Sequence, residues 1–324
     1  MDRAQHVPVL AGRVTALLAP ALAAEGAVLV DATLGRAGHA RELLQACPGM
    51  LLIGVDADVA AIDAAHDLLA PYADRVTLVH ARYDEIPAIV ADAANRGAIG
   101  PDRVMGLLFD LGVSSPQLDE PERGFAYAQD APLDMRMDQT ADLTAADVVN
   151  GYPPAELARI LREYGEERFA RRIAGAVARE RAQSPITSTQ RLAAIVRDAI
   201  PAATRRTGGN PAKRTFQALR IEVNDELGTL RRALPAALDL LAVGGRVVVL
   251  AYHSLEDRIV KTELVRRAAD HTPPGLPITA DAATPPFRLL TRGAERPGDE
   301  ETASNPRAAS ARLRAAERVR QEAA

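Results

Sequence analysis

Three aspartates are candidate ligand-binding residues because each one ends a short apolar run. The runs AVLVD, LLIGVD and VMGLLFD end at Asp31, Asp56 and Asp110. Such runs predict buried strands, and open parallel sheets bind ligands at the carboxyl ends of their strands. An acid at the end of the second strand is typical of sites that bind ribose hydroxyls. An aspartate there can also be a simple turn or cap residue, but Asp58 already suits the N-cap of the next helix, which leaves Asp56 for a ligand.

A glycine-containing turn follows the first aspartate in the stretch DATLGRAGHA, residues 31–40. Gly35 and Gly38 permit positive φ and close approach of a ligand, and the helix that follows offers unpaired N–H groups. Strand, turn and helix together predict a site that cradles a ligand. Many strand-to-helix turns contain glycine for steric reasons alone, so the turn by itself leaves both interpretations open.

Alternating strands and helices must position these residues. Strands are expected at 27–31, 51–56, 75–80 and 103–112, with helices at about 39–46, after Asp58 and from about 84. This order predicts a parallel sheet wound by right-handed crossovers. The alternation resumes with a helix over 215–241, a strand over 245–254, a helix from about 255, and the short strand candidates FRLLT and SARLRAAERV. We expect SARLRAAERV to be an edge strand, although its Ala and Arg content also suits a helix.

A long loop and a helical segment interrupt the alternation after Gly112. Residues 110–138 contain turn formers and charges without a strand or helix period, and long loops inside compact domains are usually functional. From about 143 to 200 the apolar residues have the helical period. One face carries Leu157, Ile160, Leu161 and Tyr164, and another carries Leu192, Ile195, Val196 and Ala199. We therefore expect an inserted helical subdomain.

Composition limits the class of protein. The chain has 324 residues, of which 48% are hydrophobic, so a folded globular core is expected. Cys47 is the only cysteine, which excludes an intramolecular disulfide and a cysteine-rich zinc site and fits a reducing compartment. The N-terminus does not have the pattern of a signal peptide, and no run of about 18 apolar residues occurs. We expect a cytoplasmic protein with no membrane contact and, because the histidines show no ligand spacing, no required metal.

Charge is distributed unevenly along the chain. The net charge of −4 argues against a protein that coats nucleic acid through overall positive charge. The run at 204–220 nevertheless contains Arg205, Arg206, Lys213, Arg214 and Arg220 and no acid, and the segment 307–320 has five arginines against Glu317. Either cluster could bind phosphate, or could be a solvated charged face.

Several motifs resemble one family, the bacterial small-subunit ribosomal RNA methyltransferases called RsmH or MraW. The motifs are DATLGRAGHA, DLGVSSPQLD with ERGFAY, PLDMRMD, YGEERFARRIA, NPAKRTFQALRIEVNDEL, YHSLEDRIVK and NPRAASARLRAAER, in the family's order across nearly the whole chain. The resemblance implies an α/β fold of the class I S-adenosyl-L-methionine (SAM) methyltransferases, Rossmann-like, with a mainly parallel sheet and helices on both faces. The methyltransferase domain would comprise 1–135 and 215–324, and the inserted helical subdomain 136–214.

The same resemblance implies a reaction and its partners. The family transfers a methyl group from SAM to N4 of a cytidine in the decoding region of 16S ribosomal RNA. The expected substrate is therefore small-subunit RNA, within an assembled or nearly assembled subunit, and no DNA partner is expected. Composition and spacing alone indicate only a fold that binds a nucleoside cofactor.

The resemblance also assigns a cofactor site. Its residues here are Ala37, Gly38, His39, Asp56, Tyr83, Asp110 and Gln117. The glycine turn would hold the methionine part of SAM, Asp56 would accept hydrogen bonds from the ribose hydroxyls, and Tyr83 would lie against adenine. Ala37 stands where members of the family often carry glycine, and we expect its methyl group to be tolerated only if the local φ is negative.

The expected catalytic residues are Asp110, Ser114 and Ser115, in the loop that amino-methyltransferases place against the target base. The N4 lone pair of cytosine is delocalised into the ring, so transfer needs hydrogen-bond acceptors near N4 and alignment with the methyl group. Asp110 or a backbone carbonyl at 114–116 could supply them. A strong base is unnecessary because the charge developing on the amine makes its proton acidic. The two serines could equally cap the loop.

Three alternatives stay open on the sequence alone. His253, at the end of another strand, could touch RNA, or HSLED could be a capped helix start with Ser254 as N-cap and Asp257 in the capping box. A nicotinamide-dependent oxidoreductase would share the strand–turn–helix pattern, but usually has G-x-G-x-x-G where this turn reads G-R-A-G-H. A non-catalytic RNA-binding assembly factor would use the arginine clusters alone.

Overall fold

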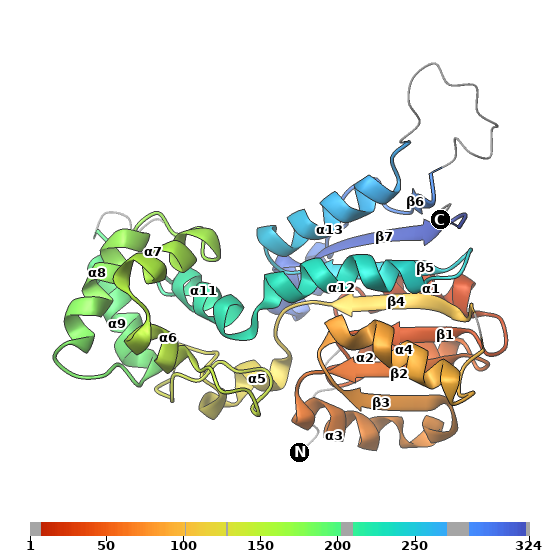
Figure 1. Cartoon of the computed structure of the whole chain (residues 1–324), viewed down its shortest axis with the longest axis horizontal. Coiled ribbons are helices and arrows are strands. Elements are labelled where there is room, and N and C mark those ends of the chain that lie inside the picture. The colour runs from red at the N-terminus through yellow and green to blue at the C-terminus, as the bar shows by residue number, and fades with distance from the viewer. Residues whose placement is uncertain (1–7, 101, 128, 202–209, 271–284, 322–324) are drawn as a thin grey trace. The chain divides into compact units, whose positions relative to one another are not determined.

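The computed structural model describes residues 8–100, 102–127, 129–201, 210–270 and 285–321, without the side chains of Ser115 and Pro116. The chain divides into two compact units (Figure 1). The first unit is Met1–Gly112 together with Thr229–Ala324, and the second is Val113–Gly228.

A seven-stranded sheet, counted over the described residues, forms the centre of the first unit in the order β3-β2-β1-β4-β5-β7-β6. Its strands are β1 (Val28–Asp31), β2 (Leu51–Asp56), β3 (Val76–His80), β4 (Val104–Asp110), β5 (Arg246–Ala251), β6 (Phe287–Leu289) and β7 (Arg312–Arg318). Strands β1 to β5 pair in parallel, which confirms the predicted parallel sheet. SARLRAAERV does form a strand, β7, but its expected edge position is wrong because β7 pairs antiparallel with both β5 and β6.

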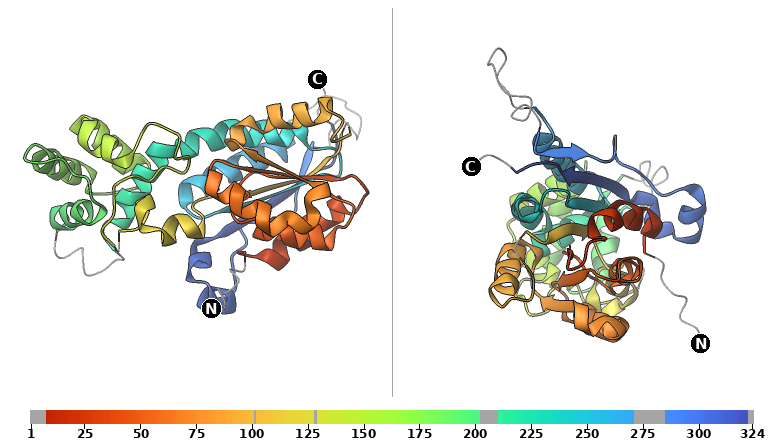
Figure 2. Two further views of the ribbon diagram at one scale, coloured as in Figure 1. Left: turned by 90° about the horizontal axis from the view of Figure 1, so that it is seen from below. Right: turned by 90° about the vertical axis from the view of Figure 1, so that its right-hand side faces the viewer.

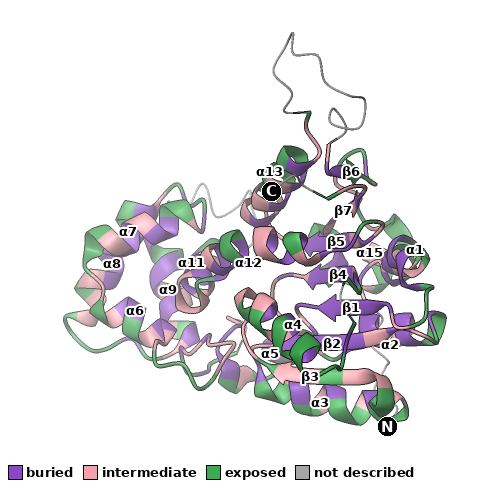
Figure 3. Cartoon of the chain, turned by 45° about the vertical axis from the view of Figure 1, so that its right-hand side comes forward, coloured by how far each residue is buried: buried purple, intermediate pink, exposed green. Residues whose placement is uncertain are grey.

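Helices cover both faces of the sheet (Figure 2). One face packs against α1 (Ala11–Leu22), α2 (Gly38–Ala46) and α3 (Val59–Leu69), and the other against α4 (Ile86–Asn95), α12 (Glu226–Leu240) and α13 (Ser254–Arg267). Successive strand residues alternate between these layers, so Leu29 joins the first layer while Val28 and Val30 join the second. Burial on both faces explains why the central strands are apolar throughout (Figure 3).

The helix expected over 215–241 is in fact two helices, α11 (Lys213–Asn224) and α12. Asp225 separates them with φ 47°, in the left-handed region. A residue in that region cannot continue an α-helix, and aspartate adopts it more readily than most residues. The prediction of a single helix was wrong because the apolar period continues across the break.

The second unit is helical, as predicted. Its α-helices in the described residues are α5 (Ser115–Asp119), α6 (Ala145–Gly151), α7 (Pro154–Glu163), α8 (Ala170–Arg181), α9 (Thr189–Ala199) and α11. The two predicted apolar faces, on α7 and α9, lie in one core. The unit is longer at both ends than the expected 136–214, because Leu133 of the preceding loop and Phe216 of α11 are buried in the same core.

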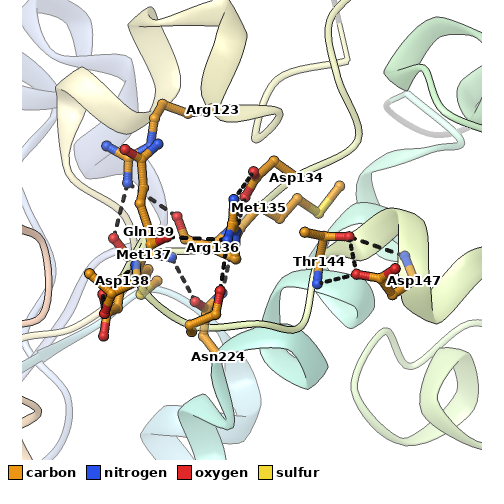
Figure 4. A network of polar contacts seen from close by, with 12 residues as sticks. Arg123, Asp134, Met135, Arg136, Met137, Asp138, Gln139, Thr144, Asp147 and Asn224 are labelled. Carbon is orange, nitrogen blue, oxygen red and sulfur yellow. Dashed lines mark hydrogen bonds and ion pairs between the residues drawn. The ribbon is translucent and has the colours of Figure 1, made fainter.

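Side-chain hydrogen bonds hold the irregular loop of the second unit (Figure 4). Arg123 Nη2 donates to the carbonyls of Arg136 at 3.1 Å and Met137 at 3.0 Å. The Asn224 amide donates to the Met135 carbonyl at 2.8 Å and accepts from the Met137 N–H at 2.7 Å. The loop is therefore ordered without regular secondary structure.

We expect Thr215→Val to stabilise the chain by about 1 kcal/mol in urea unfolding. Thr215 Oγ1 is buried in the apolar core of the second unit and has no hydrogen-bond partner among the described residues. An unpaired buried hydroxyl costs about 1 to 3 kcal/mol, and valine keeps its shape without it.

Thr189→Val is the matched control. The Thr189 hydroxyl accepts from the Ala131 N–H at 3.1 Å and donates to the Gln129 carbonyl at 2.9 Å. Its removal should lower the free energy of unfolding by about 1 kcal/mol or more. Equal losses in both variants would contradict the assignment of Thr215 as unpaired.

Candidate active site

The three aspartates lie where the sequence predicts them. Asp31, Asp56 and Asp110 are the last residues of β1, β2 and β4. Strand β1 pairs in parallel with both β2 and β4, so the three carboxylates share one edge of the sheet. This edge is where an open parallel sheet binds its ligand.

Asp56 organises the glycine turn. Its Oδ2 accepts from the Gly35 N–H at 2.7 Å, and its Oδ1 accepts from the Asp58 N–H at 2.9 Å. The expectation that Asp56 is left entirely to a ligand is therefore wrong, although each oxygen retains a second acceptor position. Burial raises the pKa of Asp56 to about 6, against the effect of the two N–H groups. Asp58 caps α3, as predicted, by accepting from the Ala60 N–H at 3.1 Å.

Ala37 has a positive φ, contrary to expectation. It is the N-cap of α2 with φ 57°, a conformation that costs a residue with a Cβ about 1 to 2 kcal/mol. The residue is fully buried in the core under α1 and α2, and burying one methyl group contributes about 0.8 kcal/mol in return. At Gly38 a Cβ would lie 2.5 Å from Pro8 Cγ, so the close approach there requires glycine.

The start of α2 offers hydrogen-bond donors. Helix α2 has no side-chain cap, and its first backbone bond runs from the Arg41 N–H to the Ala37 carbonyl at 2.9 Å. The N–H groups of Gly38, His39 and Ala40 have no partner in the described part of the chain. Such groups, with the positive end of the helix dipole, suit a carboxylate or phosphate.

A cluster of polar residues, with Asp110 and Tyr252 half-buried and His39 buried, lies beside this helix start. Asp110 Oδ1 accepts from the Tyr252 hydroxyl at 2.7 Å, and the Asp110 N–H donates to Thr33 Oγ1 at 2.6 Å. Asp110 Oδ2 lies 3.6 Å from His39 Nε2, which is too far for a hydrogen bond. His39 Nε2 is buried and has no hydrogen-bond partner among the described residues. The cluster therefore presents a ring nitrogen that makes no hydrogen bond, within ion-pair distance of a fixed carboxylate.

Sequence reasoning missed Tyr252. It directly follows β5, one residue before His253, in the YHS motif. Because β4 and β5 are neighbours in the sheet, Tyr252 lies next to the end of β4. The available signal was a polar side chain at the end of a fifth parallel strand.

Burial shifts the protonation equilibria of the cluster. It raises the pKa of Asp31 to about 7, although His39 and the Thr33 N–H act in the opposite direction. Burial disfavours the charged form of His39, but Asp110 and Asp31 outweigh it, so the net effect is a raised pKa. Burial and Asp110 also raise the pKa of Tyr252, which keeps its hydroxyl a donor. The cluster can therefore hold a proton near neutral pH.

Two further expected cofactor residues are Tyr83, in the first unit, and Gln117, in the second. Tyr83 lies in the short helix η2 (Tyr83–Glu85), and its ring packs edge-on against Phe109 with centroids 5.9 Å apart. In the second unit, the buried Gln117 accepts from the Ser114 N–H through Oε1 at 3.0 Å. The side chain of Ser115 lies outside the described residues. The roles of Ser114, Ser115 and Gln117 stay predictions.

His253 begins α13, which confirms the capped-helix alternative with a shift of one residue. The N-cap is His253 and not Ser254, and its partner in the capping box is Glu256 and not Asp257. Glu256 Oε2 accepts from the His253 N–H at 3.2 Å. Asp257 instead accepts from Arg314 Nε at 2.7 Å.

The two predicted basic clusters differ in their surroundings. In the first, Arg205 and Arg206 lie outside the described residues, and Arg220 forms two hydrogen bonds to Glu226, at 2.8 and 3.0 Å. In the second, Arg318 Nη1 donates to the Leu241 carbonyl at 2.7 Å, and Arg312 and Arg314 pair with Asp257. Most of the second cluster therefore has a structural role.

Comparison with known proteins identifies the family. The model of the MraW methylase family matches residues 3–319. The chain belongs to the MraW methylase family. One relative in this family, "Ribosomal RNA small subunit methyltransferase H" of Thermobifida fusca, is 64% identical and aligns over 98% of this chain and 94% of its own length. The protein of the same name from Streptomyces avermitilis is 57% identical, and the alignment covers both chains completely.

Membership of the MraW methylases agrees with the architecture. The fold is that of the class I SAM-dependent methyltransferases, and SAM is the methyl donor of that class. A solved structure titled as an rRNA methylase from Streptococcus thermophilus aligns over 95% of each chain, with 12% identity and a TM-score of 0.43. No helix in the described part of the chain has both the length and the apolar composition needed to span a bilayer.

Proposed function

We propose that this chain methylates small-subunit ribosomal RNA, at N4 of a cytidine in the decoding region of 16S RNA. The observation that carries the proposal is the polar cluster at the end of β4, where Tyr252 and Thr33 hold the half-buried Asp110 beside the unpaired N–H donors of α2. The relatives' names support small-subunit RNA as the substrate. The cytidine and its position come from the motif resemblance, as does the expectation that the RNA is in an assembled subunit.

The donors and acceptors of the site fit SAM. When bound, SAM supplies an electrophilic methyl group on a sulfonium. The N–H groups of Gly38 to Ala40 would hold its carboxylate, Asp56 its ribose hydroxyls, and Tyr83 its adenine. His39 Nε2, which has no hydrogen-bond partner among the described residues, would be satisfied by a polar group of the ligand. Gln117 would complete the site.

The protein residues would assist the transfer mainly by position and charge. As N4 attacks, the C4–N4 amine becomes positive, and a fixed carboxylate at Asp110 would stabilise that charge. Backbone carbonyls at 114–116 would orient the amine, with Ser114 and Ser115 binding the base. The N4 proton becomes acidic and would pass to an acceptor such as Asp110.

The proposal is tested with labelled SAM and small subunits that lack the modification. Digestion and nucleoside analysis should place the label on N4-methylcytidine from the decoding region. Label on another base, or on a cytidine elsewhere, would refute the specific assignment. Binding of SAM and RNA without transfer would instead support the assembly-factor alternative.

Asp56→Ala should weaken SAM binding at least tenfold in calorimetry. Each hydrogen bond to a charged acceptor contributes about 1.5 to 3 kcal/mol, and the substitution also releases the Gly35 N–H. Asp58→Ala is the matched control, because it removes the cap of α3 but leaves the Asp56 carboxylate in place. The control should lower stability by about 1 kcal/mol without changing SAM affinity. Equal SAM affinity in Asp56→Ala and the parent would remove Asp56 from the site.

A further inference from the structure

Basic residues gather where two helices of the second unit begin. Arg171 and Arg172 lie in the first turn of α8 and Arg168 just before it, while Lys213 and Arg214 are the first residues of α11. All five are exposed. We call these five residues the α8–α11 basic surface.

The two helix starts lie side by side. Gln217 Nε2 donates to the Tyr164 carbonyl at 2.9 Å, and Arg214 Nη1 donates to the Glu166 carbonyl at 3.0 Å. A Cβ on Gly165 would lie 2.6 Å from the Arg214 carbonyl oxygen, so glycine permits the close approach. The segment that leads into α8 therefore runs along the start of α11, and the five cations form one surface.

Ion pairing does not explain these residues. No side chain of the α8–α11 basic surface pairs with a carboxylate in the parts of the chain that the structure describes, and Arg168 lies only over the ring of Phe169, at 5.1 Å. Other exposed arginines of the same unit do have such partners. Arg162 lies 4.0 Å from Glu163, and Arg197 lies 3.3 Å from Asp198.

Helix stability does not explain them either. The N-terminus of a helix is the positive end of its dipole, where a cation is unfavourable by about 0.3 to 1 kcal/mol. Neither α8 nor α11 has an acidic residue in its first turn; the carboxylate of Glu167 lies just before α8 and accepts from the Phe169 N–H at 2.8 Å, against three arginines at the same helix start. Mutual repulsion between the five cations adds to this penalty. A multiply charged anion would remove both penalties.

We propose that the α8–α11 basic surface binds phosphates of the substrate RNA, an inference that rests on the proposed function. Arginine forks form paired hydrogen bonds with phosphate oxygens. Phosphate contacts fix the position of the RNA without reading its sequence. The α8–α11 basic surface therefore binds the RNA backbone, whereas the methyltransferase site selects the base that is methylated.

The test compares two double variants that remove the same charge from the same unit. Arg171→Gln/Arg172→Gln removes two members of the surface, and Arg162→Gln/Arg197→Gln removes two paired arginines outside it. Binding to protein-free 16S RNA and to small subunits is measured by filter binding over a range of KCl concentrations. The first variant should bind at least tenfold more weakly at low salt, with a log-log salt slope smaller by about 1.4, because each lost phosphate contact removes about 0.7. The control should stay within about twofold of the parent.

The outcomes separate this proposal from the proposed function. Both variants should bind SAM like the parent in calorimetry, which shows that the first unit is intact. An unchanged salt slope for Arg171→Gln/Arg172→Gln, or equal losses of RNA affinity in both double variants, would overturn the proposal that the α8–α11 basic surface binds RNA. If the parent protein still methylates RNA in that case, the proposed function stands. A loss seen with small subunits but not with protein-free RNA would assign the surface to an acidic protein and overturn the RNA proposal. A parent that neither binds nor methylates RNA would overturn both.

Discussion

Asp110→Asn is expected to lower single-turnover methylation at least 100-fold at saturating SAM. The Asp110 carboxylate is fixed before substrate binds, because Oδ1 accepts from the Tyr252 hydroxyl at 2.7 Å and the backbone N–H donates to Thr33 at 2.6 Å. Removing one preorganised group that stabilises transition-state charge typically costs about 100-fold or more in rate. Asparagine keeps an acceptor for Tyr252, so the fold should persist. SAM affinity is measured separately by calorimetry, since Asp110 is also an expected cofactor residue.

The Tyr252→Phe variant distinguishes the effect of positioning the Asp110 carboxylate from the effect of its charge. This variant keeps the Asp110 carboxylate but removes the hydrogen bond that fixes it, so we expect a loss of about tenfold, which corresponds to about 1.4 kcal/mol. Double replacement of Ser114 and Ser115 by Ala tests the loop in the same assay. Methylation by Asp110→Asn at the parent rate would transfer the catalytic role to the backbone carbonyls at 114–116.

Asp31→Asn is expected to become progressively stabilising, relative to the parent, as the pH rises from about 4 to above 7. Burial raises the pKa of Asp31 from 3.8 to about 7. Between these values the folded state binds more protons than the unfolded state, so the parent loses stability as the pH rises. One pKa unit corresponds to 1.36 kcal/mol, so the difference should reach about 2 to 4 kcal/mol above pH 7. Asparagine keeps the acceptor for the Thr33 N–H.

Urea unfolding from pH 5 to 9 measures this effect. Two of the groups that interact with Asp31 complicate this measurement: the pKa of Asp56 is raised to about 6, inside the same range, and the pKa of His39 is raised above its ordinary value. The His39→Gln and Asp56→Asn backgrounds each remove one of these titrations, so the parent and Asp31→Asn are compared in each background as well as in the parent background. Parallel stability curves for the parent and Asp31→Asn across this range would show that Asp31 is ionised in the folded protein at every pH tested.

The local sequence pattern determined the secondary-structure elements and the positions of the three aspartates at strand ends. Short apolar runs bounded by turn residues predict strands, and β1 to β5 lie where these runs occur. Asp31, Asp56 and Asp110 could be placed at strand ends because that position depends only on where each run stops. The helical faces of α7 and α9 followed in the same way from their period. The motifs also identified the family over nearly the whole chain.

The tertiary structure decided which of these groups meet. Tyr252 contacts Asp110, 142 residues earlier in the chain, because β5 lies next to β4 in the sheet. The local spacing of apolar residues does not predict which strands are neighbours. The antiparallel pairing of β5 with β7 likewise placed β7 inside the sheet. Ala37 has a positive φ, and burial of its methyl group in the core offsets part of the local strain. The Asp56 carboxylate supports the glycine turn by accepting from the Gly35 N–H, 21 residues earlier in the chain. Local periodicity therefore determines the elements, whereas the hydrogen bonds that build the site depend on how distant strands pair.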